Sequence, residues 1–495
     1  MENDMIAVIL NETGYEYDIH SLVKAFYPTS EVKVFVEGEK NIRSDRGLPL
    51  IRLTRSREIM TLLLSECKGE DGEWTPQVEE SVRPDPDGDK IQVKNVLKQL
   101  IYQVLSSYTG KRLPWGTLTG IRPTKIAMGL LEQGKSEEEI FRQMQDTYYL
   151  GDEKGRLCLD IARRERELLS HIHYRDGYSL YIGIPFCPTT CLYCSFTSCS
   201  IGAWKDRVGD YLDALEQEIA YTAEAFQGKV LDSVYIGGGT PTTLNPDQLE
   251  RILKKLRQCL PFDSVQEFTV EAGRADSITE EKLQVLKAYG VNRISVNPQT
   301  MREETLRLIG RRHTPQQVVE AFHLARRCGF DNINMDLILG LPGETDEDVR
   351  YTVGAVKALG PDSLTVHSLA VKRASALSKW IAENGLETIR NTDDMMEIAS
   401  GAAASMGMEP YYLYRQKNMA GNFENVGYAR PGCYGIYNIL MMEEVQTIIA
   451  VGAGSISKRV YPDGRIERCE NVKDVASFIE RIDEMIERKR KLFED

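Results

Sequence analysis

From about residue 178 onward, the sequence alternates between short runs of β-branched residues and segments whose apolar side chains have helical spacing. The segment 247–260, for example, places Leu249, Ile252, Leu253 and Leu256 on one helical face. Such alternation is typical of parallel βαβ units, because each helix carries the chain back so that the next strand runs parallel to the last. The predicted strands are residues 179–186, 232–239, 267–272, 293–298, 332–340 and 363–370.

This α/β pattern predicts an incomplete barrel. The alternation fades after about residue 370, so a partial (β/α)6 barrel fits the sequence better than a closed eight-stranded one. Polar motifs follow the strands, and active sites of (β/α) barrels lie at that end. We predict four parts: an N-terminal α+β domain (1–95), a helical connecting region (96–175), the partial barrel (176–375) and a C-terminal α+β extension that covers the substrate (376–495).

The N-terminal part has its own strand-like runs, at 5–10, 32–38, 48–54 and 59–66, around a helical segment at 20–26. Residues 69–90 are rich in Asp, Glu, Pro and Gly and are predicted to be an exposed loop or linker. A helical region is expected from Val93 to about Ser170. Within it, 115–125 is compatible with an anion site between Arg122 and Lys125 or, as we favour, with a turn that initiates a helix.

Composition narrows the function classes. The net charge is −13, which argues against a general nucleic-acid or anionic-membrane surface, because neither polyanion would be attracted. The N-terminus lacks a basic segment followed by an apolar core, and no apolar run of about 18 residues is present. We therefore expect a cytoplasmic protein. In that setting the ten cysteines are better interpreted as thiols, some of them cluster ligands, than as disulfides.

Three of these cysteines are closely spaced. Cys187, Cys191 and Cys194 form a C-x3-C-x2-C pattern. Three thiolates from one loop can hold three irons of a 4Fe-4S cluster and leave the fourth iron open to another ligand. The alternatives are a zinc knuckle or three unrelated buried thiols. Zinc would need a fourth Cys or His at a short interval, so the cluster is favoured.

A glycine run ends the second predicted strand, in GGGTPT at residues 237–242. Glycines let a backbone approach a ligand closely because no Cβ intervenes. Alone, such a run is weak evidence and is also found in ordinary strand-to-helix turns. Its position one βα unit after the cysteines strengthens the prediction of a ligand site.

Together, the cysteine spacing with its adjacent Tyr193 and the glycine run resemble the radical S-adenosylmethionine (SAM) superfamily, in the form found in oxygen-independent coproporphyrinogen dehydrogenases. VEAGRADSIT, RISVNPQT, LIGRRHT and NINMDLILGLPGET follow in the family's order. The resemblance implies a 4Fe-4S cluster whose open iron binds SAM, with a 5'-deoxyadenosyl radical as the hydrogen-abstracting species. It implies cofactor binding by Tyr181, Tyr193, Gly238, Gly239, Thr240, Glu271, Gln299, Arg311, Asp336 and Ile338. No catalytic residue is predicted.

The resemblance also suggests individual roles. Glu271 would accept hydrogen bonds from ribose hydroxyls, and Gln299 would contact the ribose or the methionyl part. Arg311 would pair with the SAM carboxylate, Asp336 with a ribose or adenine edge, and the backbone of Ile338 with the adenine. Each residue taken alone is equally compatible with an ordinary polar side chain, and their joint placement at successive strand ends favours the site.

Two later segments bear on the substrate. Aromatic and basic residues interleave between 408 and 439, a pattern that suits a flat ring system bearing carboxylates, although a buried Tyr-rich segment with solvated basic residues is almost as compatible. These residues are Tyr411, Tyr412, Tyr414, Arg415, Lys417 and Arg430. The loop at 452–455 resembles the family's G-x-G-A loop near the cofactor.

The N-terminal extension and the segment 414–428 resemble the HemZ-type branch of the family. The implied reaction converts two propionates of coproporphyrinogen III to the vinyls of protoporphyrinogen IX, with a flavodoxin or ferredoxin as electron donor. Two positions depart from the family pattern, because Gly183 and Phe196 stand where histidine and a further cysteine are expected. The alternatives are therefore a haem-binding chaperone of the same family and a radical SAM enzyme for another tetrapyrrole.

Overall fold

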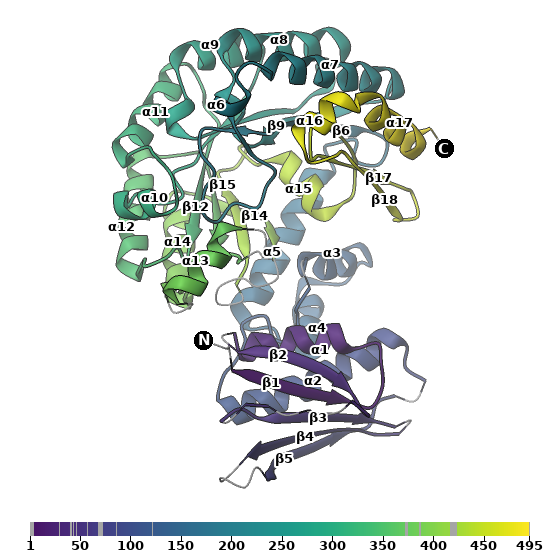
Figure 1. Ribbon diagram of the computed structural model, residues 1–495. Coiled ribbons are helices and arrows are strands. Elements are labelled where there is room, and N and C mark those ends of the chain that lie inside the picture. The colour runs from purple at the N-terminus through teal and green to yellow at the C-terminus, as the bar shows by residue number, and fades with distance from the viewer. Residues whose placement is uncertain are drawn as a thin grey trace. The chain divides into compact units, whose positions relative to one another are not determined.

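The structure, a computed structural model, describes residues 4–494 apart from 29, 40, 41, 43, 46, 57, 68–72, 86, 121, 372–374, 386, 387 and 416–422. Lys417, one of the predicted ring-binding residues, lies outside the described residues. The chain divides into two compact units, residues 1–162 and 163–495 (Figure 1). The finer four-part division stays a prediction.

The first unit contains a five-stranded mixed sheet in the order β2-β1-β3-β4-β5. Strand β1 runs parallel to β2 and β3, whereas β4 is antiparallel to both β3 and β5. Its elements are β1 (Met5–Leu10), α1 (Glu16–Phe26), β2 (Glu31–Val36), β3 (Leu50–Arg55), β4 (Met60–Cys67) and β5 (Trp74–Val82). Four of these strands and the helix match the predicted segments.

Strand β5 corrects the prediction of an exposed loop at 69–90, which was wrong for Trp74–Val82. The strand lies at the sheet edge, where β4 is its neighbour among the strands that the structure describes. It carries Pro76, Glu79 and Glu80, and proline and charge are what natural edge strands use to discourage further pairing. These same residues hide the apolar alternation by which a strand is recognised.

Four helices follow: α2 (Lys90–Thr109), α3 (Thr124–Glu132), α4 (Glu137–Tyr148) and α5 (Asp152–Leu169). Capping boxes at Asp89 and Ser136 begin α2 and α4. The apolar face of α2 shares one core with α1 and the sheet, so it belongs with the strands that precede it. Helix α3 begins directly after Pro123, which agrees with the favoured helix-initiating turn.

The second unit is built on an 11-stranded sheet in the order β14-β15-β13-β12-β11-β10-β9-β6-β16-β17-β18. Six neighbouring strands are parallel and confirm the partial (β/α)6 barrel. They are β6 (Tyr178–Ile184), β9 (Leu231–Gly238), β10 (Glu267–Gly273), β11 (Arg293–Val296), β12 (Ile333–Leu339) and β13 (Ser363–Ser368).

The C-terminal part extends both edges of this barrel sheet. Strand β16 (Thr447–Val451) adds in parallel to β6, and β17 (Ile456–Val460) and β18 (Ile466–Glu470) continue from it in antiparallel order. At the other edge, β15 (Asn425–Ala429) and β14 (Glu409–Tyr414) follow β13. The C-terminal α+β extension is therefore continuous with the barrel sheet.

Helices α7, α8, α9, α11 and α12 form an arc along the outer side of the barrel strands (Figure 1). In α8, the predicted face of Leu249, Ile252, Leu253 and Leu256 is buried, and each such side chain contributes about 1.5–3 kcal/mol. The arc helices are α7 (Val208–Ala225), α8 (Pro246–Cys259), α9 (Glu280–Ala288), α11 (Pro315–Arg327) and α12 (Asp346–Leu359).

The remaining helices are α6 (Ile201–Trp204), α10 (Glu303–Leu308), α13 (Ala376–Asn384), α14 (Asp393–Ser405), α15 (Ile436–Glu443), α16 (Val475–Glu480) and α17 (Ile482–Phe493). Two short strands, β7 (Phe186–Cys187) and β8 (Cys199–Ser200), pair with each other inside the loop after β6. Within the described residues, no helix is both long enough and apolar enough to span a bilayer.

Candidate functional site

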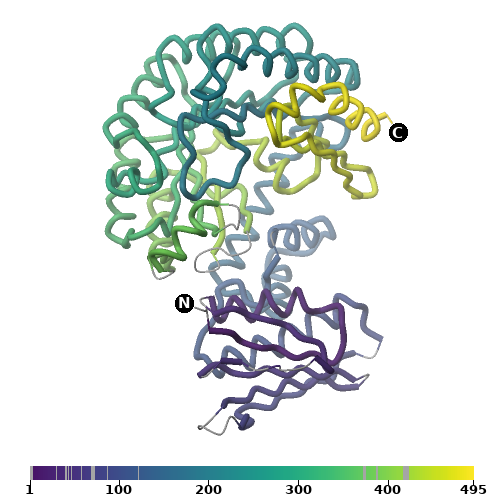
Figure 2. The backbone as a smooth tube through the Cα atoms, viewed as in Figure 1, coloured from purple at the N-terminus to yellow at the C-terminus, as the bar shows by residue number. Residues whose placement is uncertain are grey.

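The three cysteines lie in the long loop that joins β6 to α7, which crosses the inner side of the helical arc in Figure 2. Cys187 ends β7, and the backbone N–H of Cys194 donates to the carbonyl of Cys191 at 3.1 Å. The pKa of the Cys187 thiol is raised to about 11, mainly by burial; the Thr240 hydroxyl acts to lower this pKa, and the nearby Cys194 and Cys191 act to raise it. The three thiols thus lie within electrostatic reach of one another.

The glycine run packs directly against the start of this loop. Gly239 N–H donates to the Ile184 carbonyl at 2.8 Å, and Thr240 N–H donates to the Phe186 carbonyl at 2.7 Å. A Cβ on Gly239 would lie 2.6 Å from the Phe186 oxygen and 3.0 Å from Cys187 Sγ. Only glycine permits this approach, so β9 and the cysteine loop are fitted to each other.

Further contacts fix the middle of the cysteine loop. Leu192 N–H donates to the Ile309 carbonyl at 3.0 Å, and the Thr189 hydroxyl donates to the Gly310 carbonyl at 2.8 Å. The buried Arg274 guanidinium donates to both oxygens of Thr189, at 3.1 and 2.8 Å. The loop is therefore held from β10 and from the segment after α10.

Arg274 was not among the predicted site residues. It is paired with Asp276, whose pKa is lowered because the His313 and Arg274 contacts outweigh the effect of burial. His313 is buried beneath the same contacts and is a core histidine. The only signal for Arg274 in the sequence was its position at the end of a predicted strand, in VEAGR.

The arrangement of thiols can be tested against a 4Fe-4S cluster. Among the residues that the structure describes, no three His, Cys, Asp or Glu side chains converge as they would around one metal ion. A cuboidal cluster does not require that convergence, because each thiolate binds a different iron. Three thiols on one loop, beside the side-chain-free backbone at Gly239, fit such a cluster.

Arg311 connects the cysteine loop to the residue that follows β11. Its guanidinium donates to the Asn297 carbonyl at 2.6 Å and to the Tyr193 hydroxyl at 3.3 Å. Burial lowers the pKa of Arg311, but contacts with Tyr193 and Cys191 outweigh it and raise the pKa. Tyr193 and Leu192 also pack against the apolar cluster that contains Ile338. Arg311 is thus a fixed cation beside the loop.

Glu271 lies near the end of β10 and accepts a hydrogen bond from the Tyr235 hydroxyl at 2.5 Å. Burial raises the pKa of Glu271 to about 7, against the lowering effect of the Tyr235 hydrogen bond. Gly237 lies against both side chains, since a Cβ there would be 2.9 Å from the Tyr235 ring and 3.0 Å from the Glu271 carboxyl carbon. Glu271 can therefore act as a hydrogen-bond donor or as an acceptor near neutral pH.

Gln299, Asp336 and Ile338 are brought together by an isolated bridge between Gln299 and β12. Gln299 N–H donates to the Asp336 carbonyl at 2.9 Å, and Ile338 N–H donates to the Gln299 carbonyl at 3.0 Å. Gln299 has a φ of 66°, a strained conformation for a residue with a side chain, and such strain often accompanies binding sites. The amide N–H of Ile338 is thus already used within the protein.

Asp336 has polar partners that the sequence did not reveal. The amide of Asn334 donates to it at 2.7 Å, and His367 Nε2 lies 3.9 Å from its Oδ2. Burial acts to raise the pKa of Asp336, but His367 and the neighbouring polar groups outweigh it and lower the pKa. On the other side of the imidazole, Tyr414 Oη lies 3.4 Å from His367 Nδ1. The strand register explains this grouping. His367 of β13 is opposite Ile338 of β12, and Ile338 is on the same face of the sheet as Asp336, two residues away.

Three tyrosine rings form a stack inside the barrel. Tyr235 and Tyr437 are 4.5 Å apart at 22°, and Tyr181 lies 6.2 Å from Tyr235 and 6.1 Å from Tyr437. Tyr437 comes from α15, so the C-terminal region reaches the barrel interior. Its participation could not be predicted, because α15 is far from β6 and β9 in sequence.

The aromatic and basic segment is mostly internal. Tyr411 and Tyr412 are buried, which fits the alternative of a Tyr-rich buried segment, whereas Arg415 is also buried and is not the solvated base that this alternative expects. Tyr414 is half-buried and reaches His367. Arg430 Nε donates to the Met406 carbonyl at 3.2 Å and is not among these contacts.

The two departures from the family pattern have different surroundings. A Cβ on Gly183 would lie 3.4 Å from the Val451 oxygen and 3.5 Å from the Tyr181 ring, which are ordinary contact distances. The backbone therefore does not require glycine at 183. Phe196 is 72% exposed and lies at the surface.

Comparison with known proteins identifies relatives of this chain. The model of the radical SAM superfamily matches residues 181–356. The chain is 42% identical over 408 residues to the oxygen-independent coproporphyrinogen-III oxidase-like protein HemZ of Bacillus subtilis (strain 168), and the match covers 81% of each chain. It is 35% identical over 238 residues to the heme chaperone HemW of the same strain, covering 48% of this chain and 62% of HemW.

One solved structure is similar over most of its length. It is the coproporphyrinogen III oxidase HemN from Escherichia coli, described as a radical SAM enzyme. The similarity has a TM-score of 0.51 at 25% sequence identity, and it covers 65% of this chain and 73% of HemN.

Proposed function

This chain belongs to the radical SAM superfamily and, within it, to the HemN/HemZ-type family, and from that premise we propose that it catalyses the oxidative decarboxylation of coproporphyrinogen III. Two propionate groups of the substrate would become the vinyl groups of protoporphyrinogen IX. Each propionate would lose a hydrogen atom from its β-carbon, then CO2 and one electron. The electron would pass to a one-electron acceptor.

The cofactors of the superfamily, and of this chain, are a 4Fe-4S cluster and SAM. When bound, they supply the one-electron cleavage of SAM that yields methionine and the hydrogen-abstracting 5'-deoxyadenosyl radical. We propose Cys187, Cys191 and Cys194 as the cluster ligands. A reduced flavodoxin or ferredoxin is the proposed electron donor.

The observation that carries the proposal is the close fit of the cysteine loop to the glycine run. Gly239 and Thr240 place backbone and hydroxyl groups beside Cys187, where a cluster ligand would lie. The other proposed SAM contacts are Tyr181, Tyr193, Gly238, Glu271, Gln299, Arg311, Asp336 and Ile338. They come from five neighbouring barrel strands and the segments that follow them, which allows them to surround one ligand.

These side chains would bind and orient the cofactor in different ways. Arg311 would hold the SAM carboxylate, since it is a fixed cation beside the cysteine loop. Glu271 and Asp336 would accept hydrogen bonds from ribose hydroxyls. The stacked Tyr181 and Tyr437 would keep water from the interior beneath the ligand.

A haem-binding chaperone is the second candidate. It is favoured by the similarity to HemW and by Gly183, which removes a possible hydrogen-bond donor or proton carrier at the end of β6. Both candidates take a tetrapyrrole, and the acidic chain would need local cationic or tyrosine groups to hold its carboxylates.

The deciding experiment is anaerobic reconstitution with iron, sulfide, SAM and dithionite, followed by assay with coproporphyrinogen III. We expect protoporphyrinogen IX and 5'-deoxyadenosine to form together. Deoxyadenosine without a vinyl product would reject the decarboxylase assignment and leave the superfamily assignment intact. Stoichiometric binding of haem without turnover would favour the chaperone. A Gly183→His variant tests whether the missing histidine limits turnover, because an added Cβ at that position would meet only ordinary contact distances.

A further inference from the structure

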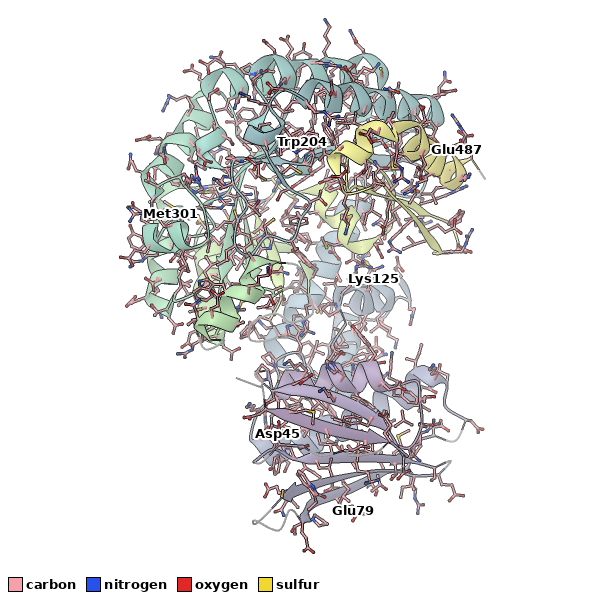
Figure 3. The ribbon with its side chains drawn as sticks, in the orientation of Figure 1. Asp45, Glu79, Lys125, Trp204, Met301 and Glu487 are labelled. Carbon is pink, nitrogen blue, oxygen red and sulfur yellow. The ribbon has the colours of Figure 1, made fainter. Side chains whose placement is uncertain are left out.

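A charged pair lies in the interior between α7 and the last helix of the chain. Lys489 of α17 and Glu218 of α7 are 1% and 0% exposed, and Lys489 Nζ is 2.5 Å from Glu218 Oε1. Asn471 completes the group, because its amide donates to Glu218 Oε1 at 2.8 Å and its oxygen accepts from Lys489 at 2.6 Å. We call Glu218, Asn471 and Lys489 the C-terminal clasp. Figure 3 labels Glu487 on the same helix, two residues before Lys489.

Stability alone is a poor explanation for such a group. Removing two charges from water costs several kcal/mol per ion, and apolar replacements of buried pairs are often neutral or stabilising. The contacts of the clasp indicate what the charges accomplish instead.

The clasp holds both backbone groups of Gly452, the residue that follows β16. Gly452 N–H donates to Glu218 Oε2 at 2.6 Å, and the Gly452 carbonyl accepts from the Asn471 amide at 2.9 Å. Glu218 therefore accepts from Gly452, Asn471 and Lys489 at once. A carboxylate has enough acceptor positions for three donors, whereas a glutamine has a single acceptor oxygen.

Gly452 in turn lies against the end of β6. A Cβ on Gly452 would lie 2.4 Å from the Gly183 oxygen. The Tyr211 hydroxyl donates to that same oxygen at 2.6 Å and accepts from Ala453 N–H at 3.1 Å. The position of the residues after β16 thus determines the position of the strand end from which the cysteine loop departs.

Residues 452–454 also contact the cysteine loop beyond its last cysteine. A Cβ on Gly454 would lie 2.8 Å from the Thr197 hydroxyl oxygen, and Thr197 follows Cys194 by three residues. Residues 452–454 therefore touch the cysteine loop at its origin and again after its last cysteine.

We propose that the C-terminal clasp is a positioning device for the cysteine loop, which makes the last helix of the chain part of the cluster-binding apparatus. Glu218, Asn471 and Lys489 act through residues 452–454 and do not touch the cofactor. This inference rests on the proposed assignment of Cys187, Cys191 and Cys194 as cluster ligands.

The test compares Glu218→Gln and Lys489→Met with Lys491→Met, which changes an exposed lysine of the same helix. After anaerobic reconstitution, iron release to a chelator and hydrogen exchange of the 452–454 and 195–200 regions are measured. A loosened loop predicts iron release about five-fold or more faster in the two clasp variants, with faster exchange in both regions. Lys491→Met should behave as the unmodified chain does. Unchanged release and exchange in folded clasp variants would overturn the proposal.

Single variants leave one buried charge unpaired and can fail to fold. The double variant Glu218→Leu/Lys489→Met removes both charges and keeps the site filled. If it melts as the unmodified chain does but releases iron faster, the clasp positions the loop. If it retains iron as the unmodified chain does, the proposal is rejected.

The unmodified chain gives an independent measurement. Cluster assembly should slow hydrogen exchange at 452–454 together with 185–200, and slowing confined to 185–200 would also reject the clasp.

Cys187→Ala in the same chelator assay tests the ligand assignment separately from the clasp. If that variant kept the full iron content, the ligand assignment would fail, whatever the clasp variants did.

Discussion

Replacement of Gly239 by alanine tests the fit between the glycine run and the cysteine loop. The added Cβ would lie 2.6 Å from the Phe186 oxygen and 3.0 Å from Cys187 Sγ. The nearer contact is with backbone, so it cannot be relieved by turning a flexible side chain. Either β9 or the cysteine loop must move by several tenths of an ångström.

Overpacking of this kind costs about 1–3 kcal/mol. If the whole cost falls on the conformation that binds the cluster, iron affinity should decrease by roughly 5- to 150-fold. Gly354→Ala is the matched control, since Gly354 lies in α12 with no atom within 4 Å of an added Cβ. That control should gain about 0.5–1 kcal/mol of unfolding free energy, because alanine favours the helix.

The assay is anaerobic competition between the reconstituted protein and an iron chelator, combined with denaturant unfolding of the iron-free protein. We expect Gly239→Ala to lose cluster affinity while its unfolding transition remains cooperative. Full cluster affinity in Gly239→Ala, together with an unfolding free energy unchanged within about 0.5 kcal/mol, would show that the contact does not constrain the loop.

Three other perturbations test separate parts of the site. Because the pKa of Glu271 is raised to about 7 by burial, the folded protein binds this proton more tightly than the unfolded chain. The free energy of unfolding should therefore include the full contribution of this group below pH about 4.5 and decrease by up to about 3 kcal/mol as the pH rises to about 7. Unfolding of Glu271→Gln measured against pH should lack this decrease. His367→Gln and Tyr414→Phe should each weaken S-adenosylhomocysteine binding about two- to ten-fold by calorimetry, because Asp336 loses a partner or that partner loses its support. If both variants bind S-adenosylhomocysteine as tightly as the unmodified chain does, the His367 contacts lie outside the nucleoside site. Cys187→Ala should abolish the iron-sulfur absorbance, whereas Cys199→Ala should retain it, and the reverse result would reassign the ligands.

The barrel could be predicted because its signals are local. Each strand is a short β-branched run, each outer helix has an apolar face such as that of α8, and the order of the six strands follows from the βαβ rule. The cysteine spacing and the glycine run are likewise contiguous in sequence. Two other strands were harder to predict: β5 because it is charged, and β16 because it joins β6 from a distant part of the chain.

Side-chain partners from distant segments were beyond prediction. His367 lies near Asp336 because β13 pairs with β12, and Tyr414 reaches His367 because β15 and β14 continue the barrel sheet. Tyr437 enters the tyrosine stack from α15, and Arg274 reaches Thr189 across the end of the barrel. None of these pairs has a sequence spacing that a periodic pattern could reveal.

The sequence by itself determined the chemistry that this protein is built for, since three thiols on one loop and a glycine run one βα unit later can be read without coordinates. Only the tertiary structure decided what holds that loop in place. Glu218 and Lys489 are 271 positions apart, yet they meet in the interior and hold Gly452 against the end of β6. The physical reason is that periodicity and spacing report interactions along a few turns of chain, whereas burial and ion pairing depend on which distant segments the sheet brings together.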